Sequence, residues 1–79
     1  GKSFNQNYLY KIASNKASSI KSIIMNQKYI VGVGNLYASE SLYLSRISPF
    51  KMGNKLKISE SDRLVRSIKR VLKKSIQMG

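Results

Sequence analysis

Residues 31–38 read VGVGNLYA, and this stretch decides the fold that we expect for the whole chain. Gly32 and Gly34 stand two residues apart, a spacing that favours a tight turn with positive φ or a close approach of the backbone. The β-branched residues around them would also suit a strand, but the sequence offers no partner strand elsewhere. We therefore predict a turn that ends at Asn35, the N-cap of a helix over residues 36–45.

Helices are predicted on both sides of this turn, and together they make an all-α bundle of four helices. One begins at the N-cap Asn5 and stops near Ser14, and a second spans residues 16–26. The apolar face of the second helix would be Ala17, Ile20, Ile23 and Ile24. The helix over 36–45 ends before Pro49, because the residue preceding proline resists the α conformation. One side of that helix would carry Leu36, Tyr37, Glu40 and Leu44.

The last helix has the clearest amphipathic pattern. A basic loop over residues 51–57 precedes it, and we predict that Ser59 caps it, with Glu60 and Asp62 in its first turn. At a helical spacing of about 100° per residue, one arc is apolar. Its members are Leu64, Val65, Ile68, Val71, Leu72 and Ile76. The opposite arc is basic and consists of Arg66, Lys69, Arg70 and Lys73. Gly79 suits a C-terminal cap.

The composition limits what the chain can do. Its 79 residues include 15 Lys and Arg against 3 Asp and Glu, a formal net charge of +12 that favours polyanionic partners. Because the sequence has no Cys and no His, it offers no disulfide, no thiolate nucleophile and no ordinary zinc site. Glu60 and Asp62 are explained as helix-start charges, and Glu40 alone makes no acid/base set. We expect no catalytic residue, no metal ligand and no membrane partner.

The predicted turn is also the candidate binding site. Backbone N–H groups at the start of a helix have no acceptor within it, and the helix dipole adds partial positive charge, so a phosphate oxygen is a natural ligand. The same glycine pattern occurs in helix-hairpin-helix modules that grip DNA backbones, and also in ordinary turns of helical bundles. The net charge of +12 favours phosphate binding.

A longer pattern resembles a known family. Residues 20–42 read IKSIIMNQKYIVGVGNLYASESL. This run resembles the helix–two-turns–helix (H2TH) region of bacterial formamidopyrimidine-DNA glycosylases, the MutM and endonuclease VIII group. The Ile-Ser-Pro run at 47–49 and the opening of the last helix fit the same family, so the resemblance extends over essentially all 79 residues. It implies that residues 1–79 are a single H2TH DNA-binding domain, a fragment of a larger protein without its N-terminal catalytic β-domain and C-terminal zinc finger.

The resemblance implies a function for that larger protein. Family members excise oxidised purines such as 8-oxoguanine and formamidopyrimidines in base-excision repair, and they nick the abasic strand as AP lyases. The parent would hold zinc in its missing finger, whereas the fragment alone is expected to be inactive and without a cofactor. The implied partner is double-stranded DNA with an oxidised base or an abasic site. The implied state and location are a monomer in the bacterial cytoplasm, at the nucleoid.

Site residues also follow from the resemblance. Asn35 and Lys21 match family residues whose side chains contact DNA phosphates near the lesion. Gly32 and Gly34 match the glycines that build the turn, and amides near Gly34 would add donors. Tyr37 lies beside this surface, where it would either contact DNA or pack between helices.

The sequence departs from the family's pattern at three positions. Asn26 stands where many relatives have Asp, Ser48 where many have His, and Ala17 where relatives often carry a basic or polar residue. Lys16 then remains as a weaker candidate DNA contact. Glu40 matches a family Glu that looks more like a tether to neighbouring elements than a catalyst.

Two alternatives remain at this point. A basic small-subunit ribosomal protein that binds RNA would pair a similar helical turn with a long Gly/Arg-rich tail, which is absent from the sequence. A helix-hairpin-helix scaffold module would bind DNA without preference for an abasic-site analogue.

Overall fold

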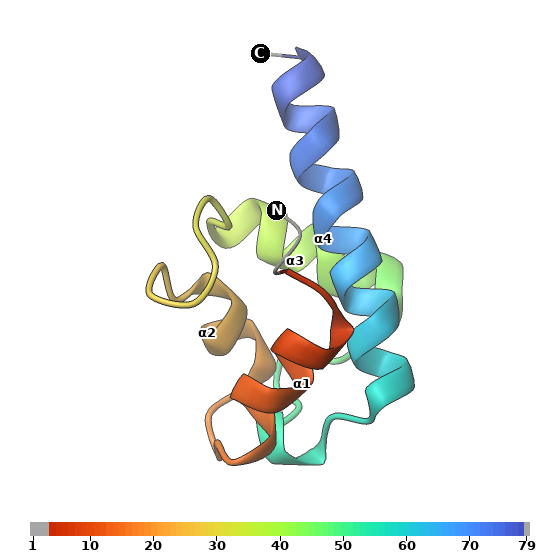
Figure 1. Ribbon diagram of the computed structural model, residues 1–79. Helices are drawn as coiled ribbons and strands as arrows, with labels where there is room; N and C mark the ends of the chain where they lie inside the picture. Colours follow the sequence, from red (N-terminus) through yellow and green to blue (C-terminus); the bar gives the residue numbers. More distant parts are fainter. Residues whose placement is uncertain (1–3, 79) are drawn as a thin grey trace.

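Four α-helices and one short 3₁₀ turn make up residues 4–78, the part of the chain that the computed structural model describes, with side chains described for residues 4–74. In chain order the elements are α1 (Gln6–Ser14), α2 (Ile20–Met25), α3 (Asn35–Ser45), η1 (Gly53–Lys55) and α4 (Ile58–Met78) (Figure 1). The all-α bundle is confirmed. The expected cap at Gly79 and the side chain of Ile76 lie outside the described residues.

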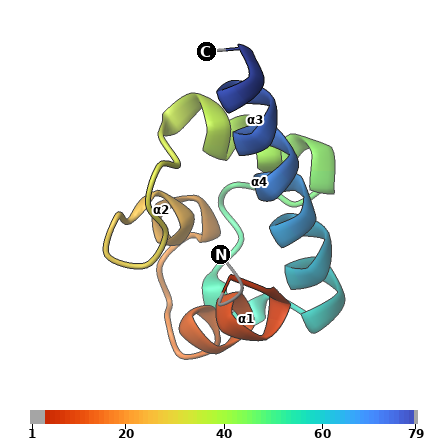
Figure 2. The same cartoon turned by 45° about the horizontal axis from the view of Figure 1, so that its top comes forward.

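The helix α4 is the longest element, and the other helices gather around it. α3 and α1 both pack against α4, and α2 packs against α3. The C-terminal part of α4 extends beyond the other helices at the top of the view, and the turn between α2 and α3 projects to the left, away from α4 (Figures 1 and 2).

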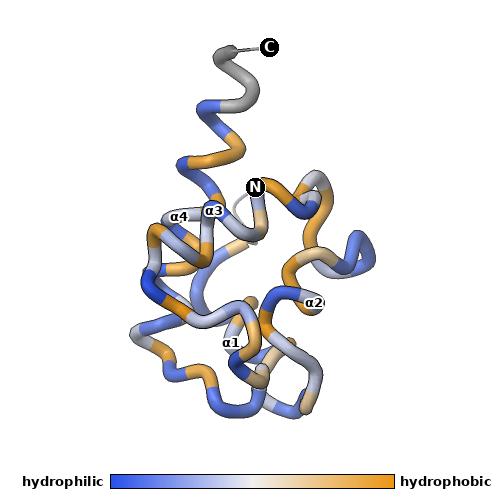
Figure 3. Tube along the Cα trace, turned by 180° about the vertical axis from the view of Figure 1, so that it is seen from behind, coloured by the Kyte–Doolittle hydropathy of each residue, from blue (hydrophilic) through white to orange (hydrophobic). Residues whose placement is uncertain are grey.

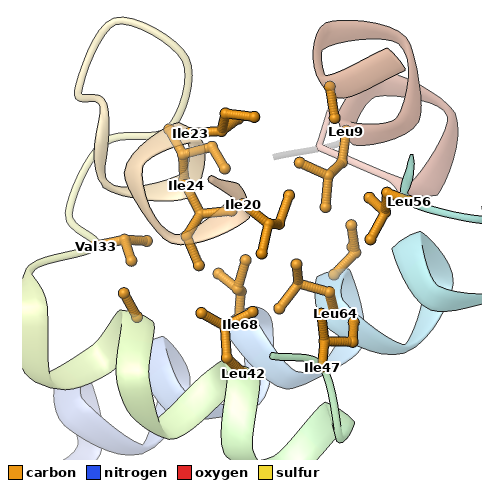
Figure 4. Packing of buried hydrophobic residues seen from close by; sticks show 14 residues of the cluster. Leu9, Ile20, Ile23, Ile24, Val33, Leu42, Ile47, Leu56, Leu64 and Ile68 are labelled. Atoms are coloured by element: carbon orange, nitrogen blue, oxygen red, sulfur yellow. The ribbon is translucent and has the colours of Figure 1, made fainter. Parts of the chain in front are cut away.

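One apolar cluster joins all four helices. Its largest fully buried side chains are Leu9 of α1, Ile20 and Ile24 of α2, Leu42 of α3, and Leu64 and Ile68 of α4 (Figure 4). The apolar arc predicted for the last helix is the buried face of α4, where hydrophobic and hydrophilic residues alternate along the chain (Figure 3). The predicted basic arc is exposed: Arg66, Lys69, Arg70 and Lys73. Both arcs are confirmed for the side chains that the structure describes.

The first helix begins and ends as predicted, but the second is shorter than predicted. Asn5 caps α1 by accepting the N–H of Tyr8 on Oδ1 at 3.0 Å. Ser19 caps α2, because its Oγ accepts the N–H of Ser22 at 3.2 Å, and α2 therefore begins at Ile20 rather than at residue 16. The predicted inward position of Ala17 is wrong, since this residue is exposed.

Residues 16–19 are extended because they pair with the segment around η1. The N–H of Gly53 donates to the carbonyl of Ser18 at 2.9 Å, and the N–H of Asn54 donates to the carbonyl of Lys16 at 2.8 Å. A single bridge between Ser19 and Met52 completes this pairing. At residues 16–19, backbone hydrogen bonds to the η1 segment thus replace the helical hydrogen bonds that the local periodicity predicts. The η1 turn itself lies within the predicted basic loop over 51–57.

The buried face of α3 is not the side on which the sequence places Leu36, Tyr37, Glu40 and Leu44. Its buried residues are Ala38, Ser41, Leu42 and Ser45. Leu36 is 80% exposed, Leu44 is 45% exposed and Glu40 is exposed as well, so Tyr37 is the one residue of that side that is partly buried. Because α3 packs against both α2 and α4, small side chains occupy the face where the helices approach. The helix ends at Arg46, whose left-handed φ of 60° stops it before Pro49 is reached.

The start of α4 is held by an acid rather than by the predicted cap Ser59. The helix begins at Ile58, and Oε1 of Glu60 accepts the N–H of Lys57 at 2.8 Å. Oε2 of Glu60 forms an ion pair with Nζ of Lys51 at 2.7 Å. Burial alone would raise the pKa of Glu60, but the hydrogen bonds from Lys51 and Lys57 and their charges hold this pKa below its usual range.

Candidate nucleic-acid interface

The chain makes two tight turns between α2 and α3. The first is organised by Asn26, whose carbonyl accepts the N–H groups of Tyr29 at 2.9 Å and Ile30 at 3.1 Å. The Oδ1 of Asn26 also accepts the N–H of Lys28 at 2.9 Å. The second turn passes through Gly32 at φ 96°. The glycine turn predicted from the sequence is confirmed, and Gly32 is its left-handed residue.

Apolar side chains anchor these turns from the inside. Ile30 and Val33 are only 6% and 1% exposed, whereas Val31 between them is 80% exposed. The hydroxyl of Tyr8 on α1 donates to the carbonyl of Tyr29 at 2.8 Å, which ties the first turn to the body of the domain. The outer edge of the second turn therefore faces solvent, while the buried side chains of Ile30 and Val33 hold the turn against the rest of the domain.

The side chain of Gln27 bridges the two turns. Its Oε1 accepts the N–H of Gly32 at 2.9 Å, and its Nε2 donates to the carbonyl of Met25 at 3.2 Å and, at a longer 3.4 Å, to that of Val33. Our sequence analysis gave Gln27 no role. The sequence feature that could have indicated this role is a carboxamide side chain just after a helix and five residues before a glycine.

The N-terminus of α3 differs from the prediction at one residue. Gly34, with φ −89° and ψ −174°, is the N-cap, and Asn35 is the first residue of the helix. The carbonyl of Gly34 accepts the N–H of Ala38 at 2.9 Å, and glycine has no side chain that could bond to the first turn. The N–H groups of Asn35 and Leu36 therefore have no acceptor within the helix.

The side chain of Asn35 is exposed at this helix start. Within the part of the chain that the structure describes, no residue forms a hydrogen bond with its carboxamide. The prediction that Asn35 caps the helix is wrong, but the consequence is an exposed amide beside two backbone donors at the positive end of the helix dipole. This group of atoms suits an anionic oxygen.

The two lysines predicted for the site precede the turn in the chain, one in α2 and one in the segment before it. Lys21 is half-buried in the first turn of α2, and its backbone N–H donates to the carbonyl of Pro49 at 3.3 Å. Lys16 lies in the extended segment before α2, with Nζ 4.8 Å from the ring centroid of Tyr29. It lines a groove of about 310 Å³ together with Ser18, Ser22, Ile23, Asn26 and Tyr29. The structure thus places Lys16 on the flank of α2, and Gly32, Gly34 and Asn35 at the turn.

Tyr37 packs inward. It is half-buried and lies against the apolar cluster. Of the two predicted roles, DNA contact and packing between helices, this position agrees with packing. Glu40, one turn further along α3, is exposed.

The acids form no catalytic group among residues 4–74. Glu60 is paired with Lys51, Asp62 is 3.2 Å from Arg66, and Glu40 stands apart from both. The described residues contain no cluster of three or more potential metal ligands, and the sequence has no Cys or His, so these residues do not fit the zinc ion that the resemblance implies for the parent protein. No helix in the described part is long and apolar enough to cross a membrane.

Comparison with known proteins gives consistent matches. A family model described as the formamidopyrimidine-DNA glycosylase H2TH domain matches residues 1–79. The formamidopyrimidine-DNA glycosylase of Prochlorococcus marinus subsp. pastoris is 53% identical over 77 residues, which cover 98% of this chain and 26% of that protein. The protein of the same name from Wolbachia pipientis subsp. Culex pipiens is 46% identical over 76 residues, which cover 96% of this chain and 28% of that protein. The chain therefore spans about a quarter of the length of these relatives.

Solved structures agree with the sequence matches. MutM (Fpg) from Thermus thermophilus superimposes with a TM-score of 0.93 at 30% identity, covering 100% of this chain and 30% of that one. A mutant Fpg from Lactococcus lactis, bound to DNA that contains Fapy-dG, gives 0.90 at 32% identity, covering 96% of this chain and 28% of that one. Neither the ribosomal protein nor the helix-hairpin-helix scaffold is supported by these matches.

Proposed function

Because the chain belongs to the formamidopyrimidine-DNA glycosylase H2TH domain family, we propose that it is the domain that holds the DNA backbone in a repair glycosylase. One observation carries the proposal: the exposed carboxamide of Asn35 stands beside backbone N–H groups that have no acceptor within α3. These donors would bind phosphate oxygens, and Lys21 would add a charged contact from α2. Phosphate contacts of this kind set the register of the strand and leave base recognition to other groups.

The proposal extends to the protein of which this domain is a part. The relatives are about four times as long as this chain, which supports a single domain within a larger enzyme. That enzyme would remove oxidised purines from duplex DNA and nick the resulting abasic strand, as a monomer in the bacterial cytoplasm, at the nucleoid. Catalytic groups and zinc would come from residues outside this chain, so the chain alone would bind damaged DNA without cleaving it.

Within this domain, Lys21, Gly32, Gly34 and Asn35 would form the principal backbone contact. Lys16 would reach a phosphate further along the strand from its groove beside α2, and Tyr37 would support the site by packing beneath it. The exposed basic face of α4 would attract the duplex at long range, since several exposed cations raise the local potential without forming fixed bonds to the DNA.

Replacing Asn35 by alanine tests the proposed contact. The variant should bind a duplex with an abasic-site analogue about 1–3 kcal/mol more weakly, because it loses hydrogen bonds to a charged phosphate. Fluorescence anisotropy at low salt measures the affinity. Asn7→Ala is the matched control, since Asn7 is equally exposed but lies on α1. Equal affinities of the two variants would contradict the assignment of the site.

The salt dependence of binding separates the charged contact from the neutral one. The logarithm of the association constant should fall linearly with the logarithm of salt concentration, with a slope of about −0.9 for each neutralised phosphate. Lys21→Met should make the slope less steep by about 0.9, whereas Asn35→Ala should lower the affinity with the slope unchanged. A titration series of the three proteins measures both, and equal slopes for all three would argue against a phosphate contact by Lys21.

A further inference from the structure

Gln27 occupies a distinctive place in the turn that precedes the proposed phosphate site. Its single carboxamide reaches three backbone groups: the last turn of α2 at Met25, the left-handed Gly32, and Val33. The N–H of Gly32 can only donate, so the atom that faces it must be Oε1, and Nε2 then faces the two carbonyls. The orientation of the side chain is therefore set by its partners.

These bonds bear directly on the start of α3. Val33 is the residue before the N-cap Gly34, and Gly32 has φ 96°, a left-handed conformation that glycine adopts without steric strain. A Cβ built on Gly32 or on Gly34 would have no atom within 4 Å, so close packing does not restrain these two residues. Among the described residues, the carboxamide of Gln27 is the one side chain that hydrogen-bonds to the Gly32–Val33 pair.

The position of Gln27 on the surface distinguishes this role from general stabilisation. Gln27 is exposed and contributes nothing to the buried cluster, whereas Ile30 and Val33 hold the turn on the core. Solvent-exposed hydrogen bonds add little to the free energy of unfolding, because water replaces them when they break. Their loss would instead widen the range of orientations available to the donors of Asn35 and Leu36.

We propose that Gln27 is a positioning residue, which holds Gly32 and Val33 so that the donors of Asn35 and Leu36 point together at one phosphate. This inference rests on the proposed function, because it assigns Gln27 to that same site. When the donors are already held in the bound orientation, less conformational entropy is lost on binding DNA. The side chain of Gln27 should therefore affect the affinity for DNA rather than the free energy of unfolding.

The test compares Gln27→Met with Gln6→Met in the 79-residue chain. Methionine keeps the length and neutrality of the side chain but removes both the donor and the acceptor, and Gln6 on α1 provides the same substitution away from the turn. The measurements are duplex affinity by anisotropy, the melting temperature, and hydrogen exchange of the Gly32 amide by NMR.

We expect Gln27→Met to bind the duplex about 3- to 10-fold more weakly, the range for loss of one or two neutral hydrogen bonds. Its Gly32 amide should exchange faster, with a melting temperature close to that of Gln6→Met. In a double variant with Asn35→Ala, the two losses should be less than additive, because both act on one contact.

Three results would overturn the inference. If Gln27→Met binds like Gln6→Met while Asn35→Ala is weakened, the site stands and the role of Gln27 is wrong. If affinity falls only in step with the melting temperature, Gln27 merely stabilises the fold. If Asn35→Ala also binds normally, the proposed function fails and the inference fails with it.

Discussion

A chain that carries both Lys21→Met and Asn35→Ala is expected to bind duplex DNA at least about 100-fold more weakly than the unsubstituted chain. Each side chain would contribute a hydrogen bond to a charged phosphate, worth about 1.5–3 kcal/mol, and about 1.4 kcal/mol corresponds to a tenfold change in affinity. The two residues stand on different helices, α2 and α3, and share no hydrogen bond, so their losses should roughly add.

The matched control for this double variant is Lys73→Met with Asn7→Ala. It removes the same charge and the same carboxamide from exposed positions on α4 and α1. Anisotropy titrations at low salt with a duplex that contains an abasic-site analogue compare the two proteins, and circular dichroism checks that both are folded. If both double variants lose the same affinity, binding depends only on the total charge, and no localised backbone site exists at the turn.

Gly53→Val is expected to lower the free energy of unfolding by about 3 kcal/mol or more, at the upper end of the usual cost of overpacking. A Cβ at Gly53 would lie 2.6 Å from the carbonyl oxygen of Ala13 and 2.6 Å from Cδ1 of Ile23. The carbonyl belongs to the backbone of α1 and cannot turn aside as a side chain can. The loop must therefore separate from α1, which also strains the backbone bonds from this segment to residues 16 and 18.

Urea denaturation followed by circular dichroism measures this effect. Gly34→Ala is the control, because a Cβ at that position would meet no atom within 4 Å and the residue has φ −89°. We expect this control to lose about 1 kcal/mol at most, because glycine is the better N-cap but has no capping side chain that alanine would remove. Equal stability of the two variants would mean that the η1 segment yields easily and does not restrain α1.

The sequence predicts those parts of the fold that depend on local signals. The start of α1 at Asn5 and the buried arc of α4 follow from capping chemistry and helical periodicity, which act over a few residues. The shortened α2 does not, because residues 16–19 pair with a segment around Met52, more than thirty residues away along the chain. The buried face of α3 does not follow from local signals either, because its packing against two helices determines which residues are buried, and apolar Leu36 remains exposed.

The candidate site is predictable to a similar degree. The glycine spacing predicts the tight turn, whereas only the structure shows that Gly32 is its left-handed residue. The prediction that Asn35 is the N-cap of α3 is wrong by one residue. Asparagine is a strong capping residue, and only the observed backbone shows that Gly34 occupies the N-cap position. The role of Gln27 depends on where its side chain reaches, which sequence spacing does not determine.

The packing of α4 has a consequence for the order in which the domain becomes functional during synthesis. Leu64 and Ile68 fill the space beneath α2 and α3, and the hydroxyl of Ser61 donates to the carbonyl of Gln6 at 2.8 Å, across 55 residues. A nascent chain that has emerged only as far as α3 therefore contains every residue of the turn but lacks α4, the helix on which the rest of the domain packs. If the turn binds DNA as proposed, its site is complete only after α4 has been synthesised. A product that terminates before α4 would contain every residue of the motif, and we expect it not to bind DNA.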